Sequence, residues 1–145
     1  MNKTSAFDVR NFLPYLLNQA AEASSLEFQK VYKDKYGMLR NEWRVLFHLG
    51  IFGRMTASDI GARARMHKTK ISRAVQRLAE RRYLSRQRAE DDRRVEYLAL
   101  TPTGQRVYED LKGIAADYDA ALIEGMTEQE AATLRGLLER LALRP

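Results

Sequence analysis

The sequence predicts a mainly α-helical fold with one small β-hairpin, arranged as a winged helix-turn-helix. Apolar residues recur at helical spacing over most of the chain, and one helix near its middle has an apolar face and a basic face. Two short segments of strand-like composition follow that helix directly. Since 145 residues are enough to bury a real core, we expect a single domain over 1–145.

The first long helix is predicted to begin near Asn11 and to end at Gly37, because apolar side chains follow a 3.6-residue period between them. Pro14 is tolerated there, since the first turn of a helix leaves its N–H groups unbonded. A second helix is expected from Asn41, as its N-cap, to the region 50–53.

The middle of the chain predicts two helices separated by a short turn. Thr56 to Asp59 matches a capping box with aspartate in the fourth position, so a short helix starts there. The next helix starts at His67 or Lys68. Its inner face is apolar and carries Ile71, Ala74, Val75 and Leu78. Its outer face is basic and carries Lys70, Arg73, Arg77 and Arg81. One side of this helix suits a protein core and the other suits an anion.

A hairpin is predicted next, with strands at 83–88 and 95–100 joined by the charged link 89–94. The second strand is mostly apolar on both faces, which leaves its orientation open. Two strands alone are marginally stable in water, so the hairpin is expected to pack on the preceding helices.

Two further helices complete the predicted chain. Thr101 as N-cap and Pro102 at the first position open a helix that reaches about Glu124, and a full capping box from Thr127 to Glu130 opens the last one. Their apolar residues fit either an internal core or a dimer seam, and the small winged part offers them little to pack on, which favours the seam. These residues are Leu111, Ile114, Tyr118, Leu122, Leu134, Leu137, Leu138 and Leu141.

The net charge of +6 is unevenly distributed. Between Arg63 and Arg94, twelve lysines and arginines face four acidic residues. A basic block inside a foldable domain indicates a polyanionic partner, most often nucleic acid. A membrane-surface helix would need an exposed apolar face, but the predicted core uses the apolar face of this helix.

Composition argues against several other classes. The chain has no cysteine, which excludes disulfides and thiol chemistry. Its start shows no secretory signal and no apolar run is long enough to span a membrane, so a cytoplasmic protein is expected, associated with the nucleoid when bound to DNA. Its two histidines are far apart, and no phosphate-binding loop, nucleophile motif or metal-spaced cluster is present. We therefore expect no enzyme, no catalytic residue, no metal and no cofactor.

The basic helix is predicted to read duplex DNA, because the major groove admits one helix and displays distinguishable base edges. The side chains placed to do so are His67, Lys68, Thr69, Lys70, Ser72, Arg73 and Arg77. His67 and Lys68 stand at the helix start, where free N–H groups attract a phosphate.

Four motifs together resemble the MarR family of bacterial transcription regulators. They are the run from His67 to Leu84, Asp92-Arg-Arg94, Leu100-Thr-Pro-Thr-Gly104 and Glu42-Trp-Arg-Val-Leu46. The resemblance implies a homodimer in which 8–36 and 101–145 are dimerisation helices and 37–100 is the DNA-binding winged helix-turn-helix. The two recognition helices would enter successive major grooves of a pseudo-palindromic operator.

The resemblance also assigns roles in the wing. Arg94 matches the wing-tip arginine that enters the minor groove, Asp92 matches the acid that braces it, and Arg93 lies between them. The solvated-turn alternative for 90–94 remains open on charge pattern alone. Two residues depart from the family pattern, since Ala89 stands where many relatives have Asp and Arg82 where many have Gly. A left-handed turn at Arg82 would cost about 1 kcal/mol, so either the turn differs here or Arg82 accepts the strain and contributes a phosphate contact.

Family members often bind aromatic acids or phenols between their dimerisation helices and the winged part. Tyr15, Trp43, Arg44 and His48 are the candidates for such an effector pocket here. The residues alone favour the alternative in which Trp43 is a core residue and Arg44 forms a surface or interface ion pair. The expected function is a sequence-specific DNA-binding repressor released by a small effector. The alternative is a winged-helix protein–protein interaction module that does not read specific DNA.

Overall fold

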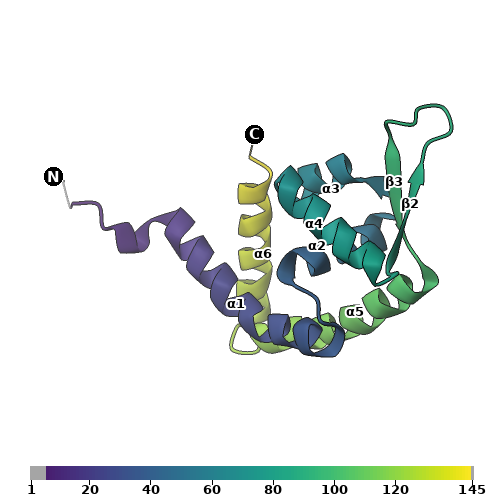
Figure 1. Cartoon of the computed structure of the whole chain (residues 1–145). Coiled ribbons are helices and arrows are strands. Elements are labelled where there is room, and N and C mark those ends of the chain that lie inside the picture. The colour runs from purple at the N-terminus through teal and green to yellow at the C-terminus, as the bar shows by residue number, and fades with distance from the viewer. Residues whose placement is uncertain (1–5, 145) are drawn as a thin grey trace. The chain divides into compact units, whose positions relative to one another are not determined.

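Ten elements make up residues 6–144, the part of the chain that the computed structural model describes (Figure 1). In chain order they are the 3-10 helix η1 (Val9–Asn11), α1 (Leu13–Tyr36), α2 (Arg40–Phe52), β1 (Met55–Thr56), α3 (Ala57–Ala64), α4 (Lys68–Glu80), β2 (Leu84–Arg88), β3 (Glu96–Leu100), α5 (Pro102–Leu122) and α6 (Glu128–Ala142). They form two compact units, one that ends at Leu111 and one that begins at Lys112, both within α5.

The core of the first unit joins one fully buried side chain from each of several elements. Leu46 of α2, Ile60 of α3, Leu78 of α4, Leu98 of β3 and Leu111 of α5 are all at most 1% exposed. Leu111 therefore belongs to this core, and its assignment to a dimer seam is wrong. Burial of apolar area of this kind is the main force that holds such a domain together.

The predicted end of α1 is confirmed, and its start lies two residues later than Asn11. The helix starts one residue before Pro14 and ends at Gly37, whose φ of 65° lies in the left-handed region that favours glycine. The predicted N-cap of α2 is wrong. Asn41 lies inside the first turn, and the cap position is Leu39. The Glu42 carboxylate accepts a hydrogen bond from the Leu39 N–H at 3.2 Å, which is the half of a capping box that a leucine at the cap still allows.

The helix pair α3 and α4 follows the sequence pattern closely. Thr56 and Asp59 exchange side-chain hydrogen bonds with each other's backbone N–H at 3.1 and 3.3 Å, which confirms the capping box at the start of α3. The four apolar residues predicted for the inner face of α4 are all buried, so its register is confirmed.

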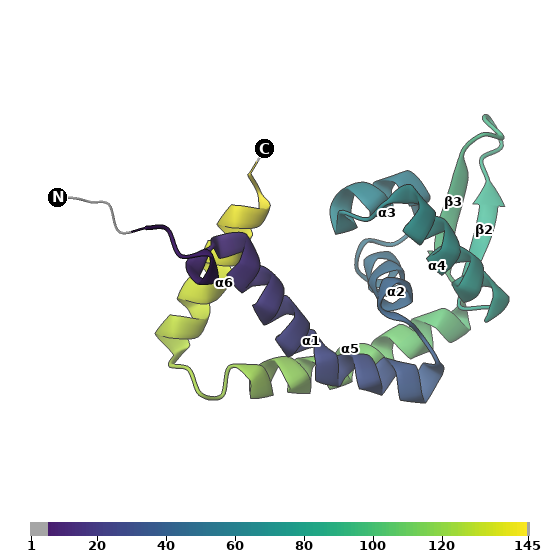
Figure 2. The same ribbon diagram turned by 60° about the vertical axis from the view of Figure 1, so that its left-hand side comes forward.

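The sheet has three antiparallel strands in the order β1–β3–β2. β1 was not predicted, because two residues carry no periodic signal. Met55 of β1 pairs with Leu98, and Leu98 also pairs with Arg86 of β2. Leu98 is buried while its neighbours Tyr97 and Ala99 are half-buried, which settles the orientation that the pattern left open. Figure 2 shows the β2–β3 hairpin projecting beside α4.

The two last helices start as predicted. Thr101 Oγ1 accepts from the Gly104 N–H at 3.0 Å, Pro102 is the first residue of α5, and Thr127 and Glu130 form the capping box of α6. α5 ends at Leu122, two residues earlier than expected. No helix within residues 6–144 combines the length and apolar character of a membrane span.

Candidate nucleic-acid interface

The outer face of α4 is a continuous polar surface of the winged part. All seven side chains predicted for DNA contact on this helix are exposed, from His67 at the cap position to Arg77 one turn before the end. They share one face because the apolar residues between them turn inward at helical spacing. The structure therefore brings this part of the predicted site together.

Three cations on this face are available to bind an anion. Within residues 6–144, Lys68, Lys70 and Arg73 form no hydrogen bond or ion pair through their side chains. The His67 side chain does not cap the helix, so it leaves the first N–H groups of α4 without a bond from the cap residue. Free N–H groups and the positive end of the helix dipole favour a phosphate at this position.

Arg77 differs from the other cations because it faces a buried acid. Its Nε lies 3.8 Å from Oε2 of Glu42, whose side chain is only 3% exposed. A buried carboxylate requires a nearby positive charge. Arg77 therefore links α4 to α2 in addition to its exposed position on the outer face, a role that its helical spacing did not indicate.

A groove of about 720 Å³ lies along this face between the start of α2 and α4. Leu39 and Glu42 line one side, and Lys70, Arg73 and Arg77 line the other. Three cations and two carboxylates, those of Glu42 and Glu80, therefore line this groove.

The tip of the hairpin carries a braced arginine. Arg94 Nε and Nη2 donate to the two carboxylate oxygens of Asp92 at 3.1 and 3.2 Å, and its backbone N–H donates to Oδ1 at 3.0 Å. The side-chain hydrogen bond from Arg94 lowers the pKa of Asp92, so the carboxylate stays charged at neutral pH. Arg94 remains 91% exposed. The pair that the family resemblance predicted is therefore present at the wing tip.

Arg93 is exposed next to this pair, and its carbonyl accepts a hydrogen bond from Arg88 of β2 at 2.7 Å. The hairpin is further joined to α4 by Arg86, which donates to Glu96 of β3 at 3.2 Å and to Gln76 of α4 at 3.3 Å. Sequence reasoning missed Arg86 and Gln76, because their contact joins segments with different periods.

Of the two alternatives for the turn after α4, the structure shows the strained one, with a φ of 62° at Arg82. The Arg82 N–H donates to Ala79 O and the Tyr83 N–H donates to Leu78 O, both at 2.9 Å, which is the Schellman pattern. The Arg82 carbonyl accepts from Thr101 Oγ1 at 2.6 Å. Arg82 thus keeps a left-handed backbone although it is not glycine, because its N–H, its carbonyl and the N–H of Tyr83 are all hydrogen-bonded.

Three of the four residues predicted for an effector pocket lie together on α2, and Tyr15 lies in a different hollow. Trp43 packs on Tyr32 and Phe47, with ring centroids 6.0 and 5.2 Å away. Arg44 donates to the Ala64 carbonyl, and burial lowers its pKa. His48 is buried, and its Nδ1–H donates to the Arg44 carbonyl at 2.6 Å.

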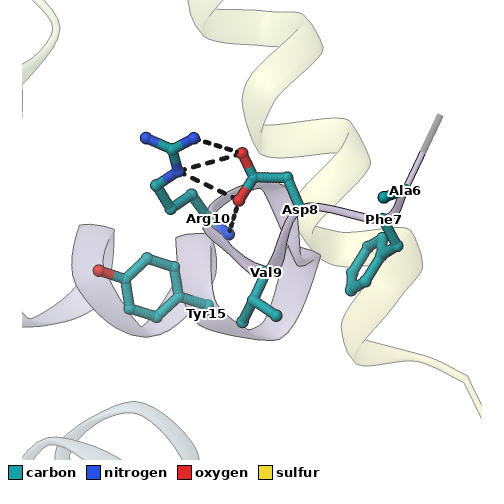
Figure 3. Close-up of a pocket in the computed structure, with 6 residues that line it drawn as sticks. All are labelled: Ala6, Phe7, Asp8, Val9, Arg10 and Tyr15. Carbon is teal, nitrogen blue, oxygen red and sulfur yellow. Dashed lines mark hydrogen bonds and ion pairs between the residues drawn. The ribbon is translucent and has the colours of Figure 1, made fainter.

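Tyr15 instead lines a hollow with residues 6–10, beside Val9 and the Asp8–Arg10 ion pair, whose shortest contact is 2.7 Å (Figure 3). None of the other three candidates lines this hollow. Among residues 6–144, no three histidine, aspartate or glutamate side chains gather as a metal site would require.

Comparison with known proteins finds similar sequences and similar folds among bacterial transcription regulators. The model of the MarR family matches residues 36–95, which run from the end of α1 into the wing. A MarR/EmrR family transcriptional regulator from Acinetobacter sp. ADP1 is 26% identical, with a TM-score of 0.83 over 94% of this chain and 96% of that chain. The chain is thus similar to MarR-family regulators, by the family model over residues 36–95 and by its fold over most of its length.

Other relatives extend the likeness along nearly the whole chain. The Bordetella bronchiseptica protein BpsR, whose DNA binding is regulated by 6-hydroxynicotinic acid, has a TM-score of 0.87 at 20% identity over 97% of this chain and 100% of that chain. The HTH-type transcriptional regulator YwoH of Bacillus subtilis is 22% identical over 118 residues, 80% of this chain and 85% of its own. The chain is a winged helix-turn-helix transcription regulator similar to the MarR family, and these relatives are transcription regulators.

Proposed function

We propose that the chain binds a pseudo-palindromic operator as a homodimer and represses transcription where that operator overlaps a promoter. In this proposal 37–100 reads DNA, and 8–36 and 101–145 supply the dimer contacts. The observation that carries it is the exposed face of α4, where Lys68, Lys70 and Arg73 have no side-chain partner within residues 6–144. Counterion release by such side chains supplies much of the affinity for DNA.

Each side chain has a distinct role in the proposed complex. Lys70, Arg73 and the short hydroxyls of Thr69 and Ser72 face base edges in the major groove, where arginine and lysine favour guanine. His67, Lys68 and Arg77 contact phosphates. Arg93 and Arg94 enter the minor groove, whose narrow A-tracts attract arginine, while Asp92 holds the Arg94 guanidinium in place.

Apolar surface on the outer helices supports the dimer. On α6, Leu134, Leu137, Leu138 and Leu141 repeat at helical spacing and are each 38–47% exposed. Phe12 and Leu13 at the start of α1 are 45% and 58% exposed. A second copy that covers these side chains would bury them by two-fold symmetry. Such a dimer would place its recognition helices about one DNA turn apart.

The proposed effector is a small aromatic or phenolic acid, by similarity to BpsR. It would lower operator affinity by binding better to a dimer whose recognition helices have a different spacing. Tyr15, Trp43, Arg44 and His48 remain the proposed candidates. Arg44 and His48 each donate one hydrogen bond to a backbone carbonyl, so an effector anion would bind the remaining N–H groups of the Arg44 guanidinium.

Selection of duplexes from a random pool by the purified protein tests the DNA-binding proposal. We expect enrichment of a pseudo-palindrome whose half-sites are centred about 10 bp apart. Arg94→Ala should weaken binding of the selected duplex while circular dichroism stays unchanged. Enrichment of no common sequence would contradict the proposal, and equal affinity of Arg94→Ala and parent would reject the role of the wing.

The effector proposal has its own test. Aromatic acids, with 6-hydroxynicotinic acid among them, are added to the preformed complex with the selected duplex. An effector should release that duplex and also raise the melting temperature of the free protein. A set of such acids that changes neither quantity would contradict this part of the proposal.

A further inference from the structure

Arg81, which directly follows α4, reaches the last carbonyl groups of α1. Its Nη1 donates to the Tyr36 carbonyl, and its Nη2 donates to the Gly37 carbonyl at 2.7 Å. Carbonyls at a helix C-terminus have no partner within the helix, and the helix dipole makes this end negative. One planar guanidinium therefore bridges the ends of two helices with two hydrogen bonds.

Gly37 leaves the space for this bridge. A Cβ built at Gly37 would lie 2.9 Å from Nη1 and 3.2 Å from Nη2 of Arg81. The same residue has the left-handed φ that ends α1. The position thus combines a turn that favours glycine with a close approach that a side chain would hinder.

The end of α1 is itself fixed to α5. The Tyr36 hydroxyl donates to Asp110, and Lys35 Nζ lies 2.7 Å from the same carboxylate. The Tyr36 ring also meets the edge of Tyr83, with centroids 6.5 Å apart. Arg81 therefore does not bind a loose chain end, but a corner that α5 holds in place.

The backbone of α4 packs chiefly on α2, α3 and β2. Its connection to α1 is therefore a polar contact at one point and not a broad apolar face. The planar Arg81 guanidinium donates two hydrogen bonds to the end of α1. Two bonds restrict the rotation of α4 relative to α1 more than a single bond would.

We propose that Arg81 is a positioning residue that sets the direction of α4 relative to α1, and thereby the spacing of the two recognition helices in the dimer. The inference rests on the proposed function, in which α1 belongs to the dimerisation part. Arg81 acts through the helix it ends, and its guanidinium is occupied by α1 carbonyls and not by DNA.

Arg81→Met in the full-length protein tests this role, because it keeps the aliphatic stem and removes both hydrogen bonds. Arg106→Met is the matched control, since it removes the same charge from an exposed site on α5 whose guanidinium bonds Thr103 of its own helix. The probes are the duplex selected by the parent, versions with the half-site spacing one base pair longer or shorter, and a scrambled duplex.

We expect the parent and Arg106→Met to prefer the selected spacing. Arg81→Met should bind that spacing about 5- to 150-fold more weakly and discriminate less between the three spacings. Its salt dependence should match that of the parent, because the number of phosphate contacts is unchanged. Arg81→Lys keeps the charge and one donor group, so its spacing preference should fall between those of the parent and Arg81→Met.

Two results would overturn the inference. One is a spacing preference in Arg81→Met equal to that of the parent, and the other is an equal loss of affinity on every duplex, including the scrambled one. If Arg81→Met does not fold, as judged by circular dichroism, the same comparison is made with Arg81→Lys. A parent that does not distinguish selected from scrambled DNA would instead contradict the proposed function, and this inference with it.

Discussion

Two arginines four residues apart on α4 have different surroundings. Arg73 is exposed and has no side-chain partner within residues 6–144, whereas Arg77 lies 3.8 Å from the buried carboxylate of Glu42. The Arg73 guanidinium is therefore free to bind, while that of Arg77 also neutralises a charge inside the protein. Substitutions at these positions should separate DNA recognition from fold stability.

Arg73→Ala should weaken binding of the selected duplex by about 1–3 kcal/mol and relax specificity at one base pair, because a base contact is lost. Its free energy of unfolding should stay within about 0.5 kcal/mol of the parent, as for most surface changes. Arg77→Ala should lower DNA affinity and also destabilise the fold by about 1 kcal/mol, since Glu42 loses its counter-charge. Urea unfolding measures the stability of each variant, and a binding titration measures its affinity for the selected duplex. Equal stability of the two variants would contradict the structural role of Arg77.

Arg82→Gly should stabilise the fold by up to about 1 kcal/mol, because it relieves the left-handed backbone at a φ of 62°. Arg106→Gly removes the same charge from the interior of α5 and should destabilise by about 1 kcal/mol. Urea unfolding of both variants gives the comparison. A loss of stability in Arg82→Gly would show that its side chain contributes more than its backbone costs.

Element ends show how far the sequence predicted the structure. Thr56 and Thr127 opened helices as expected, because a capping box is a local pattern of four residues. Asn41 was wrongly placed, because the Glu42 side chain reaches back to the Leu39 N–H. The Arg81 bridge escaped prediction for a different reason. Its two hydrogen bonds join Arg81 to residues 45 and 44 positions earlier in the sequence. No local sequence pattern at either place predicts this contact.

The junction of α1 and α5 gives a prediction at the scale of elements. Burial and the hydrogen bond to Asp110 raise the pKa of Tyr36 to about 12, while Lys35 and Tyr36 lower the pKa of Asp110. The folded state therefore holds the Tyr36 proton more tightly than the unfolded state, whose pKa is about 10. Stability should fall as the pH rises from about 10 to 12.

Tyr36→Phe removes the titrating hydroxyl and its hydrogen bond. It should cost about 0.5–1.5 kcal/mol at pH 7 and make the alkaline loss of stability smaller than in the parent. Urea unfolding at pH 7, 10 and 11 compares the two proteins. Tyr15→Phe is the control, because Tyr15 is exposed and its hydroxyl lies outside this junction. The same alkaline slope in parent and Tyr36→Phe would contradict the junction as described.

At the scale of the whole molecule, the outer helices leave apolar side chains exposed that the winged part does not need for its core. Leu138 of α6 is 40% exposed, in contrast to Ala131, which is 5% exposed on the same helix. A monomer would keep such a surface in water, and a dimer would cover it. The resemblance to the MarR family, and not the pattern of leucines alone, made the dimer predictable from the sequence.

Leu138→Glu should convert the dimer to a monomer at micromolar concentration, because a charge would be buried in the dimer contact. Operator affinity should fall with it, since one recognition helix then binds alone. Ala132→Glu, on an exposed site of the same helix, should leave the dimer intact. Analytical ultracentrifugation separates the two outcomes, and a dimeric Leu138→Glu would reject the proposed seam.

The most direct measurement is a binding titration of the selected duplex and a scrambled duplex at several salt concentrations. We predict tight, selective binding by a dimer, with an affinity that falls steeply with salt because several phosphates are neutralised by α4 and the wing. Equal, weak binding of both duplexes, or an affinity that does not change with salt, would contradict the account and favour a winged-helix module that binds protein instead of DNA.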